Sequence, residues 1–216
     1  MKFERVALAS FPRSGNTWVR HLIYHTTGSG SYCIHSTETD KVHQAAHIPE
    51  ITDVWSPFAK THFCDTEGFD AVIHIVRNPL TAIASYKDYC SDFNVPTPED
   101  FVSQEIDGWI RHYEYWRLAV ISGAVRGLVI RYEDLVADPL RNMWGIIEFL
   151  EWPDITQEKV LEAVDKCSIE NLRRNGGHKF FNEGINRDSR NSLSYDQRAT
   201  ILDSAFTQCR ALGYMK

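Results

Sequence analysis

The residues with the clearest chemical potential lie in the loop after the first apolar run, Val6–Ala9. Arg13 brings a fixed positive charge, Gly15 lets an anion approach the main chain, and Thr17 can cap the helix that follows. The N-terminus of that helix adds a partial positive charge on its backbone N–H groups. This combination predicts a cradle for phosphate or sulfate, although a plain strand-to-helix turn shows the same pattern.

A second candidate pair, Lys60 and His62, ends a short strand-like segment, FAKTH. Residues two apart on a strand share one face of the sheet. A lysine there can neutralise negative charge, and a histidine can act as a general base because its ordinary pKa lies near neutrality. The alternative is a partly exposed strand end without a chemical role.

A third candidate pair is Arg77 and Ser85, which lie at the end of the apolar run 71–76 and on the helix expected after Pro79. Open α/β sheets bind ligands at the carboxyl ends of their strands. A guanidinium can hold phosphate oxygens bidentately while a serine hydroxyl adds a further hydrogen bond. Ser85 is equally suited to packing against the sheet as a small residue.

The elements that must position these residues alternate between strand and helix patterns. Short apolar runs predict buried parallel strands at 6–9, 71–76 and 127–131. Helical patterns follow at 79–89, 98–122, 139–150, 157–164, 168–174 and 195–212. This alternation predicts a single α/β domain with a central, mostly parallel sheet flanked by helices.

Composition excludes several classes of protein. The 216 residues are 43% hydrophobic and 24% charged, which suits one globular domain over residues 1–216. A net charge of −6 argues against a general nucleic-acid or membrane-surface binder. The five cysteines lack metal-ligand spacing, so we expect reduced thiols, no metal site and a cytoplasmic protein. No apolar run approaches the ~20 residues of a membrane span, and no signal peptide is expected.

Residues 175–194 differ from the rest, being rich in Gly, Asn, Ser and Arg with little periodicity. A long irregular segment in a compact domain is usually a functional lid or a disordered piece. The basic residues here, which include Arg187 and Arg190, suit a loop that covers an anionic cofactor.

With these segments placed, nearly the whole chain resembles the sulfotransferases that use 3′-phosphoadenosine 5′-phosphosulfate (PAPS). FPRSGNTW at 11–18 is similar to their 5′-phosphosulfate loop, YPKSGTTW, and to the form FPRxGNTW of WSC-domain sulfotransferases. KTH at 60–62 resembles the segment with their catalytic base, and RNP at 77–79 with Ser85 resembles their 3′-phosphate motif. Two further motifs follow in the family's order, GWIRHYEYW at 108–116 and YEDL at 132–135.

The resemblance implies a P-loop-like sulfotransferase fold and an enzyme that moves a sulfuryl group from PAPS to an acceptor hydroxyl or amine. The product is 3′-phosphoadenosine 5′-phosphate (PAP), and no metal is required. His62 is implied as catalytic base, with Lys60 and Arg13 as catalytic charge clamps. The implied cofactor-binding residues are Arg13, Ser14, Gly15, Asn16, Thr17, Trp18, Arg77, Ser85, Tyr132, Ser168, Gly184, Arg187 and Arg190.

The chain departs from the family pattern at three places. Arg13 stands where lysine is usual, and an arginine can stabilise charge but cannot donate its proton near neutrality. The late motif RKGxxGxWKxxF aligns loosely with 182–190, and its leading basic pair is absent. Arg187 or Arg190 can replace those charges, or the 3′-phosphate is held more weakly. Cys167–Ile169 stands where an aromatic residue near the adenine is usual.

The acceptor and two other functions stay open from the sequence. His62, Phe63, Tyr86, Tyr89 and His112 can line a pocket of mixed aromatic and polar character, for a small-molecule or glycan acceptor. A P-loop nucleotide kinase shares the strand–loop–helix opening, but FPRSGNTW lacks the Gly-Lys-Ser/Thr ending that holds phosphates and magnesium. A non-catalytic nucleotide-binding protein is the other alternative, and the presence of Lys60 and His62 argues against it.

Overall fold

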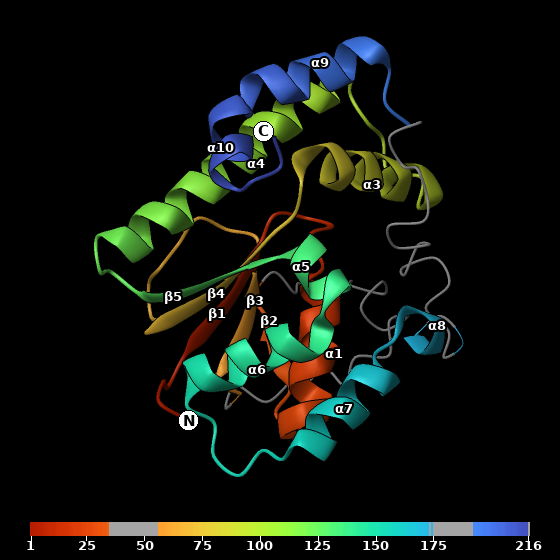
Figure 1. Cartoon of the computed structure of the whole chain (residues 1–216). Coiled ribbons are helices and arrows are strands. Elements are labelled where there is room, and N and C mark those ends of the chain that lie inside the picture. The colour runs from red at the N-terminus through yellow and green to blue at the C-terminus, as the bar shows by residue number, and fades with distance from the viewer. Residues whose placement is uncertain (35–55, 173, 175–191, 216) are drawn as a thin grey trace.

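A parallel sheet forms the centre of the computed structural model, which describes residues 1–34, 56–172, 174 and 192–215. Within these ranges the sheet has five strands in the order β2-β3-β1-β4-β5 (Figure 1). The strands are β1 (Val6–Ser10), β2 (Ser31–Cys33), β3 (Phe58–Thr61), β4 (Ala71–Val76) and β5 (Arg126–Arg131). The predicted α/β fold with a parallel sheet flanked by helices is confirmed. The three-residue β2 was not predicted.

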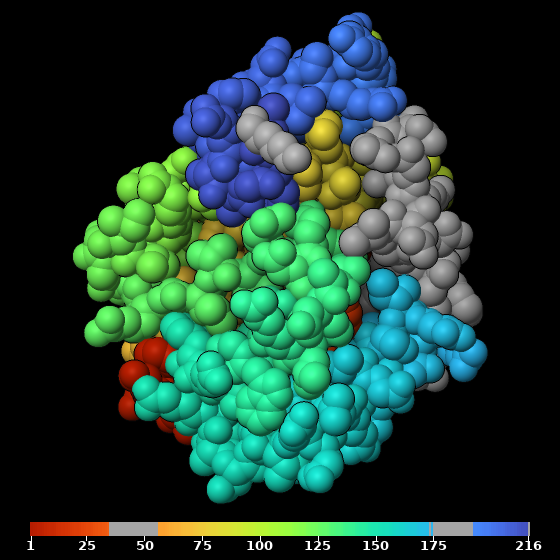
Figure 2. Space-filling model, viewed as in Figure 1, coloured from red at the N-terminus to blue at the C-terminus, as the bar shows by residue number. Residues whose placement is uncertain are grey.

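Helices cover the sheet in two groups (Figure 1). The first group comprises α1 (Asn16–Thr27), α5 (Tyr132–Ala137), α6 (Pro139–Leu150), α7 (Gln157–Lys166) and α8 (Ile169–Leu172). The second comprises α3 (Pro79–Asp92), α4 (Phe101–Ile121), α9 (Tyr195–Ser204) and α10 (Phe206–Ala211). In Figure 2 the side chains of α6 and α7 cover the lower part of the visible face and those of α9 and α10 the upper part. Over the described ranges, none of the helices combines the length and apolar character needed to cross a bilayer.

The helix starts follow local sequence signals, but the last helix is interrupted. Pro79 and Pro139 each open a helix whose preceding Asn or Asp side chain accepts a backbone N–H. Ser194 starts α9 through a capping box with Gln197. The single helix expected over 195–212 is wrong, because Ala205 separates α9 from α10. No glycine or proline marks this break in the sequence.

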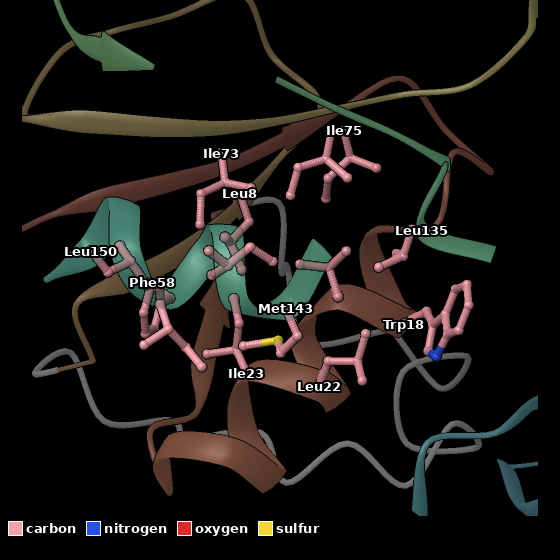
Figure 3. Packing of buried hydrophobic residues seen from close by; sticks show 14 of the residues in the cluster. Leu8, Trp18, Leu22, Ile23, Phe58, Ile73, Ile75, Leu135, Met143 and Leu150 are labelled. Atoms are coloured by element: carbon pink, nitrogen blue, oxygen red, sulfur yellow. The ribbon is translucent and has the colours of Figure 1, made fainter. Parts of the chain in front are cut away.

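Strand β1 is buried along its whole length and sends alternate side chains to opposite faces. Val6 and Leu8 face the core shared with α1 and α6, whereas Ala7 and Ala9 belong to the cluster around Trp116 of α4. The small alanines leave room for the Trp116 ring, which is fully buried. Figure 3 shows the larger core on the α1 side. In it, Leu8, Ile73 and Ile75 of the strands point toward Leu22 and Ile23 of α1 and Met143 of α6. Burial of each such side chain contributes roughly 1.5–3 kcal/mol.

The strand register brings the carboxyl ends of four strands to one edge of the sheet. Ala9 lies opposite Thr61 in β3, Ser10 opposite Ile75 in β4, and Ile75 opposite Ile130 in β5. The segments that follow these strands therefore leave the sheet side by side. In open α/β sheets this edge is where ligands bind.

Two histidines lie in the core between β4 and α4. His74 and His112 are 2% and 4% exposed, and their ring centroids are 5.2 Å apart. In the described part of the chain, Nδ1 of His74 and Nε2 of His112 have no hydrogen-bond partner. Burial lowers the pKa of His112 to about 4, and burial with the neighbouring His112 lowers the pKa of His74 well below 6.5. Both side chains are therefore neutral at pH 7.

Fold stability should fall as the pH drops from about 6.5 toward 4, because there the unfolded chain binds protons on these histidines while the folded chain does not. For a pKa that moves from 6.5 to about 4, His112 alone should cost roughly 2 kcal/mol between pH 7 and pH 5. Chemical unfolding at both pH values should show that His112→Leu loses less unfolding free energy between pH 7 and pH 5 than the wild type does. The same substitution at the more exposed His25, whose pKa burial lowers less, should change the loss by less. Equal losses in wild type and His112→Leu would contradict this account.

Candidate active site

The loop between β1 and α1 forms a tight turn at the carboxyl edge of the sheet. The Ser14 N–H donates to the Phe11 carbonyl at 3.3 Å, and Arg13 and Gly15 have left-handed backbones with φ of 62° and 97°. Helix α1 begins at Asn16 with Gly15 as its N-cap, so the expectation that Thr17 caps it is wrong. The described residues supply no side-chain cap here. The first backbone N–H groups of α1 therefore point to this edge without an intrahelical acceptor.

Two buried polar side chains stabilise or line this turn. Asn16 Nδ2 donates to the Leu8 carbonyl at 2.8 Å and to Ser10 Oγ at 3.2 Å, which ties the helix start to β1. Ser14 is 1% exposed, and its Oγ has no hydrogen-bond partner within the described ranges. A buried hydroxyl in this position is a ready donor to an anion bound in the turn.

Tyr132, the first residue of α5, packs directly on the turn. A Cβ atom added to Gly15 would lie 2.6 Å from Cδ2 of Tyr132, so only glycine fits here. The Tyr132 ring also meets the Trp18 ring edge-on, with centroids 6.1 Å apart. The Trp18 indole N–H donates to the Cys167 carbonyl at 2.8 Å. Gly15 and Trp18, two of the predicted cofactor residues, thus both contact a third, Tyr132.

His62 lies at the same edge, one residue beyond the end of β3. Its Nδ1 donates to the Ser10 carbonyl at 2.6 Å, at the end of β1. Because a carbonyl only accepts, the neutral imidazole carries its proton on Nδ1 and its lone pair on Nε2. This is the tautomer that can accept a proton from another molecule. Lys60 lies two residues earlier, buried in β3 and opposite Leu8 of β1.

Helix α4 positions the segment that carries His62. The Trp116 indole N–H donates to the Phe63 carbonyl at 3.2 Å. The Phe63 ring is 54% exposed although its main chain is held in this way. Phe63, the residue after the candidate base, is therefore tied to α4 through its main chain while its side chain is more than half exposed.

Arg77 follows the last residue of β4, and neighbouring groups fix its side chain. Its Nη1 donates to the Arg13 carbonyl at 2.9 Å and its Nε to Thr81 Oγ1 at 3.1 Å. The guanidinium carbon lies 4.4 Å from the centroid of the Tyr132 ring, a cation–π contact. Burial lowers the pKa of Arg77, but an arginine stays charged at neutral pH.

The side chain of Arg13 extends toward α3. Its Nε donates to Ser85 Oγ at 3.4 Å, and its guanidinium carbon is 5.1 Å from the centroid of the Tyr89 ring. Burial, and next the charge of Arg77, lower the pKa of Arg13 to about 10. Arg13, Arg77 and Ser85 form one positively charged group, which we call the arginine cluster.

The other predicted site residues that the structure describes lie in separate surroundings. Tyr86 packs against Phe11 and Phe101, with ring centroids 6.3 and 5.6 Å apart, and burial raises its pKa to about 12. His112 lies in the core beside His74. Ser168 Oγ accepts the N–H of Asn171 at 3.3 Å, at the start of α8. Gly184, Arg187 and Arg190 lie outside the described residues, as does most of the expected covering loop 175–194.

Sequence reasoning missed a carboxylate that links three segments. Glu133 Oε1 accepts the Asn78 N–H at 3.0 Å, and Glu133 Oε2 accepts the Tyr214 hydroxyl at 2.8 Å. Asn78 Oδ1 in turn accepts the Leu80 N–H at 3.0 Å and caps α3. The YEDL and RNP motifs contained Glu133 and Asn78, but no local pattern indicated Tyr214.

Several known proteins are similar to this chain in sequence. WSCD family members of Drosophila pseudoobscura pseudoobscura and Drosophila melanogaster are 29% and 28% identical over 88% and 96% of this chain. The chain spans 59% and 64% of their respective lengths. Cytosolic sulfotransferase 4 of Arabidopsis thaliana is 21% identical over 91% of this chain and 70% of its own length.

Solved structures share the fold. Mouse sulfotransferase SULT7A1 complexed with PAP superposes with a TM-score of 0.73 at 20% identity, over 96% of this chain and 84% of its own. Retinol dehydratase in complex with androsterone and inactive cofactor PAP superposes with a TM-score of 0.70 at 14% identity, over 95% and 80%. These likenesses establish the sulfotransferase fold of this chain.

The family is established by sequence. Residues 70–208, more than half of the chain, match the family described as sulfotransferase domain. The matched part includes the Arg77–Pro79 turn, helix α4 and the Tyr132–Leu135 motif, three of the segments on which the resemblance rested. The chain belongs to the sulfotransferase domain family.

Proposed function

We propose that this chain transfers a sulfuryl group from PAPS to a hydroxyl or amine of an acceptor. The observation that carries the proposal is the bond from His62 Nδ1 to the Ser10 carbonyl. This bond holds the His62 ring at the end of β1, where the anion-binding turn begins. It also leaves the basic lone pair of the ring on Nε2. Family membership and the fold support the same reaction.

The residues of the turn suit a nucleotide with phosphate groups at both the 5′ and 3′ positions. The backbone N–H groups of Gly15–Trp18 and the buried Ser14 hydroxyl, which has no partner among the described residues, hold the 5′-phosphate. The absence of a Cβ at Gly15 makes room for the Tyr132 ring, which packs on this turn. Arg77 holds the 3′-phosphate at the end of β4.

The chemical step needs a base and fixed positive charge. PAPS, when bound, supplies the activated sulfuryl group. His62 accepts the proton of the acceptor at Nε2 as the acceptor oxygen or nitrogen attacks. Lys60 neutralises negative charge that develops on the transferred group and the leaving phosphate. The Ser10 carbonyl keeps His62 in the required tautomer and orientation.

The acceptor contacts His62 and the exposed ring of Phe63. The ring offers an apolar surface beside the base, which favours a small molecule with an apolar or ring-shaped body adjoining its nucleophile. A small molecule is therefore our first choice of acceptor, ahead of a glycan.

Incubation of the chain with ³⁵S-labelled PAPS and a panel of phenols, sugars, guanidines and peptides tests the function. Label should move to at least one acceptor. A parallel incubation with γ-³²P-labelled ATP and magnesium tests for a nucleotide kinase. Phosphate transfer in that arm, or tight binding of PAP without turnover on any acceptor, would contradict the proposal in favour of a kinase or a non-catalytic binding protein.

Replacing His62 by alanine should lower kcat by ~10²-fold or more, because the acceptor loses its base. The Kd for PAP should change by less than about twofold, since the imidazole is not required for phosphate binding. His25→Ala, which alters an exposed histidine of α1, is the matched control and should leave kcat unaltered. Wild-type turnover in His62→Ala would remove this residue from the base role.

Replacing Arg77 by glutamine should raise the Kd for PAP by ~10-fold or more. The loss of one charge-assisted hydrogen bond costs about 1.5–3 kcal/mol, and 1.4 kcal/mol corresponds to tenfold in affinity. Arg126→Gln, at the opposite end of the sheet where the side chain is exposed, is the control. Thermal unfolding of both variants shows whether the lost bond to the Arg13 carbonyl affects folding. An unaltered Kd in a folded Arg77→Gln would exclude the assignment.

A further inference from the structure

The main chain that follows His62 is held at two points. The Phe63 N–H donates to Thr61 Oγ1 at 3.0 Å, and the Phe63 carbonyl accepts the Trp116 indole N–H at 3.2 Å. Thr61, at the end of β3, and Trp116, in α4, are both 0% exposed. Each of the two peptide groups after His62 is therefore bonded to a side chain that is itself buried.

The Trp116 ring has a fixed direction because it is packed on several sides. It belongs to a buried cluster with Ala7 and Ala9 of β1, and the Tyr115 ring meets it edge-on with centroids 5.5 Å apart. Side chains in such close-packed surroundings keep one rotamer. The indole N–H therefore points steadily at the carbonyl that it binds.

Strand β1 supports both the ring of His62 and the main chain beside it. The His62 Nδ1 donates to the Ser10 carbonyl at 2.6 Å, one residue beyond the Ala9 that packs on Trp116. The imidazole is thus held by β1 directly, while Phe63 is held by β1 through Trp116. A shift of the main chain at Phe63 would turn the imidazole about its bond to Ser10 and redirect Nε2.

We infer that Thr61 and Trp116 are positioning residues for sulfuryl transfer. By holding the main chain of Phe63, they fix the direction in which His62 presents Nε2 to the acceptor. This inference rests on the proposed function, because it assigns His62 the base role. Both residues act through His62, so their contributions to the rate should vanish when His62 is absent.

The test is the rate of transfer in a single turnover, at saturating ³⁵S-labelled PAPS and an acceptor that the wild type labels. Trp116→Phe removes the N–H and keeps an aromatic ring. The rate should fall roughly tenfold, since displacement of a catalytic group by about 1 Å can cost ~10²-fold. The Kd for PAP should change by less than about twofold. In a His62→Ala background, Trp116→Phe should change the rate by less than about twofold.

Thr61→Val provides a second variant, which removes the acceptor of the Phe63 N–H and keeps a side chain of similar shape. It should show the same pattern, a slower transfer when His62 is present and no further loss in His62→Ala. Chemical unfolding shows whether each variant is folded. If Trp116→Phe does not fold, Thr61→Val decides whether the main chain of Phe63 positions the base.

Trp109→Phe is the matched control on the same helix. Trp109 is 1% exposed, and its indole N–H donates to the Arg77 carbonyl at 3.0 Å, away from the segment that carries His62. The substitution removes a similar bond and a similar volume. Any change in rate that it causes should therefore be the same factor with His62 as with alanine at position 62.

Equal losses from Trp116→Phe in both backgrounds would show that Trp116 supports only the fold and would overturn the inference. A wild-type rate in a folded variant would remove the replaced residue from the positioning role. A wild-type chain that transfers no label to any acceptor would instead overturn the proposed function. Wild-type transfer by His62→Ala would overturn the base assignment, and with it this inference.

Discussion

The site depends on the contact between the Tyr132 ring and the main chain of Gly15. The ring lies where a Cβ on Gly15 would be, and it also contacts Trp18 and the guanidinium of Arg77. One side chain therefore sets the distance between the turn after β1, helix α1 and the end of β4. Glu133, the next residue, extends this arrangement by binding the Asn78 N–H of the turn after β4.

The parallel sheet places the chemistry at one edge, and the packing below that edge supports it. Strand β1 is paired with β3 on one side and β4 on the other, so the turn after β1 lies between His62 and Arg77. The small side chains of Ala7 and Ala9 allow Trp116 to pack against β1. Trp116 then holds the main chain of Phe63, next to the candidate base.

The sequence predicts the strands and most helices because their signals are local. Apolar runs indicate β1, β4 and β5, and Pro79 and Pro139 indicate helix starts. The features it missed depend on residues far apart in the chain. Gly15 replaces Thr17 as N-cap, His74 meets His112, and Arg13 extends to α3, and each of these outcomes is decided by how separate elements pack. The order of motifs nevertheless identified the family before any contact was known.

A crystal structure of the chain with PAP would show whether the turn after β1 and the end of β4 together hold one bisphosphate nucleotide. We expect the 5′-phosphate within hydrogen-bonding distance of the backbone N–H groups of Gly15–Trp18. We also expect the 3′-phosphate against Arg77, and His62 Nε2 facing the side of the 5′-phosphate from which sulfate is transferred. PAP bound elsewhere, or with its 5′-phosphate away from this turn, would contradict the account.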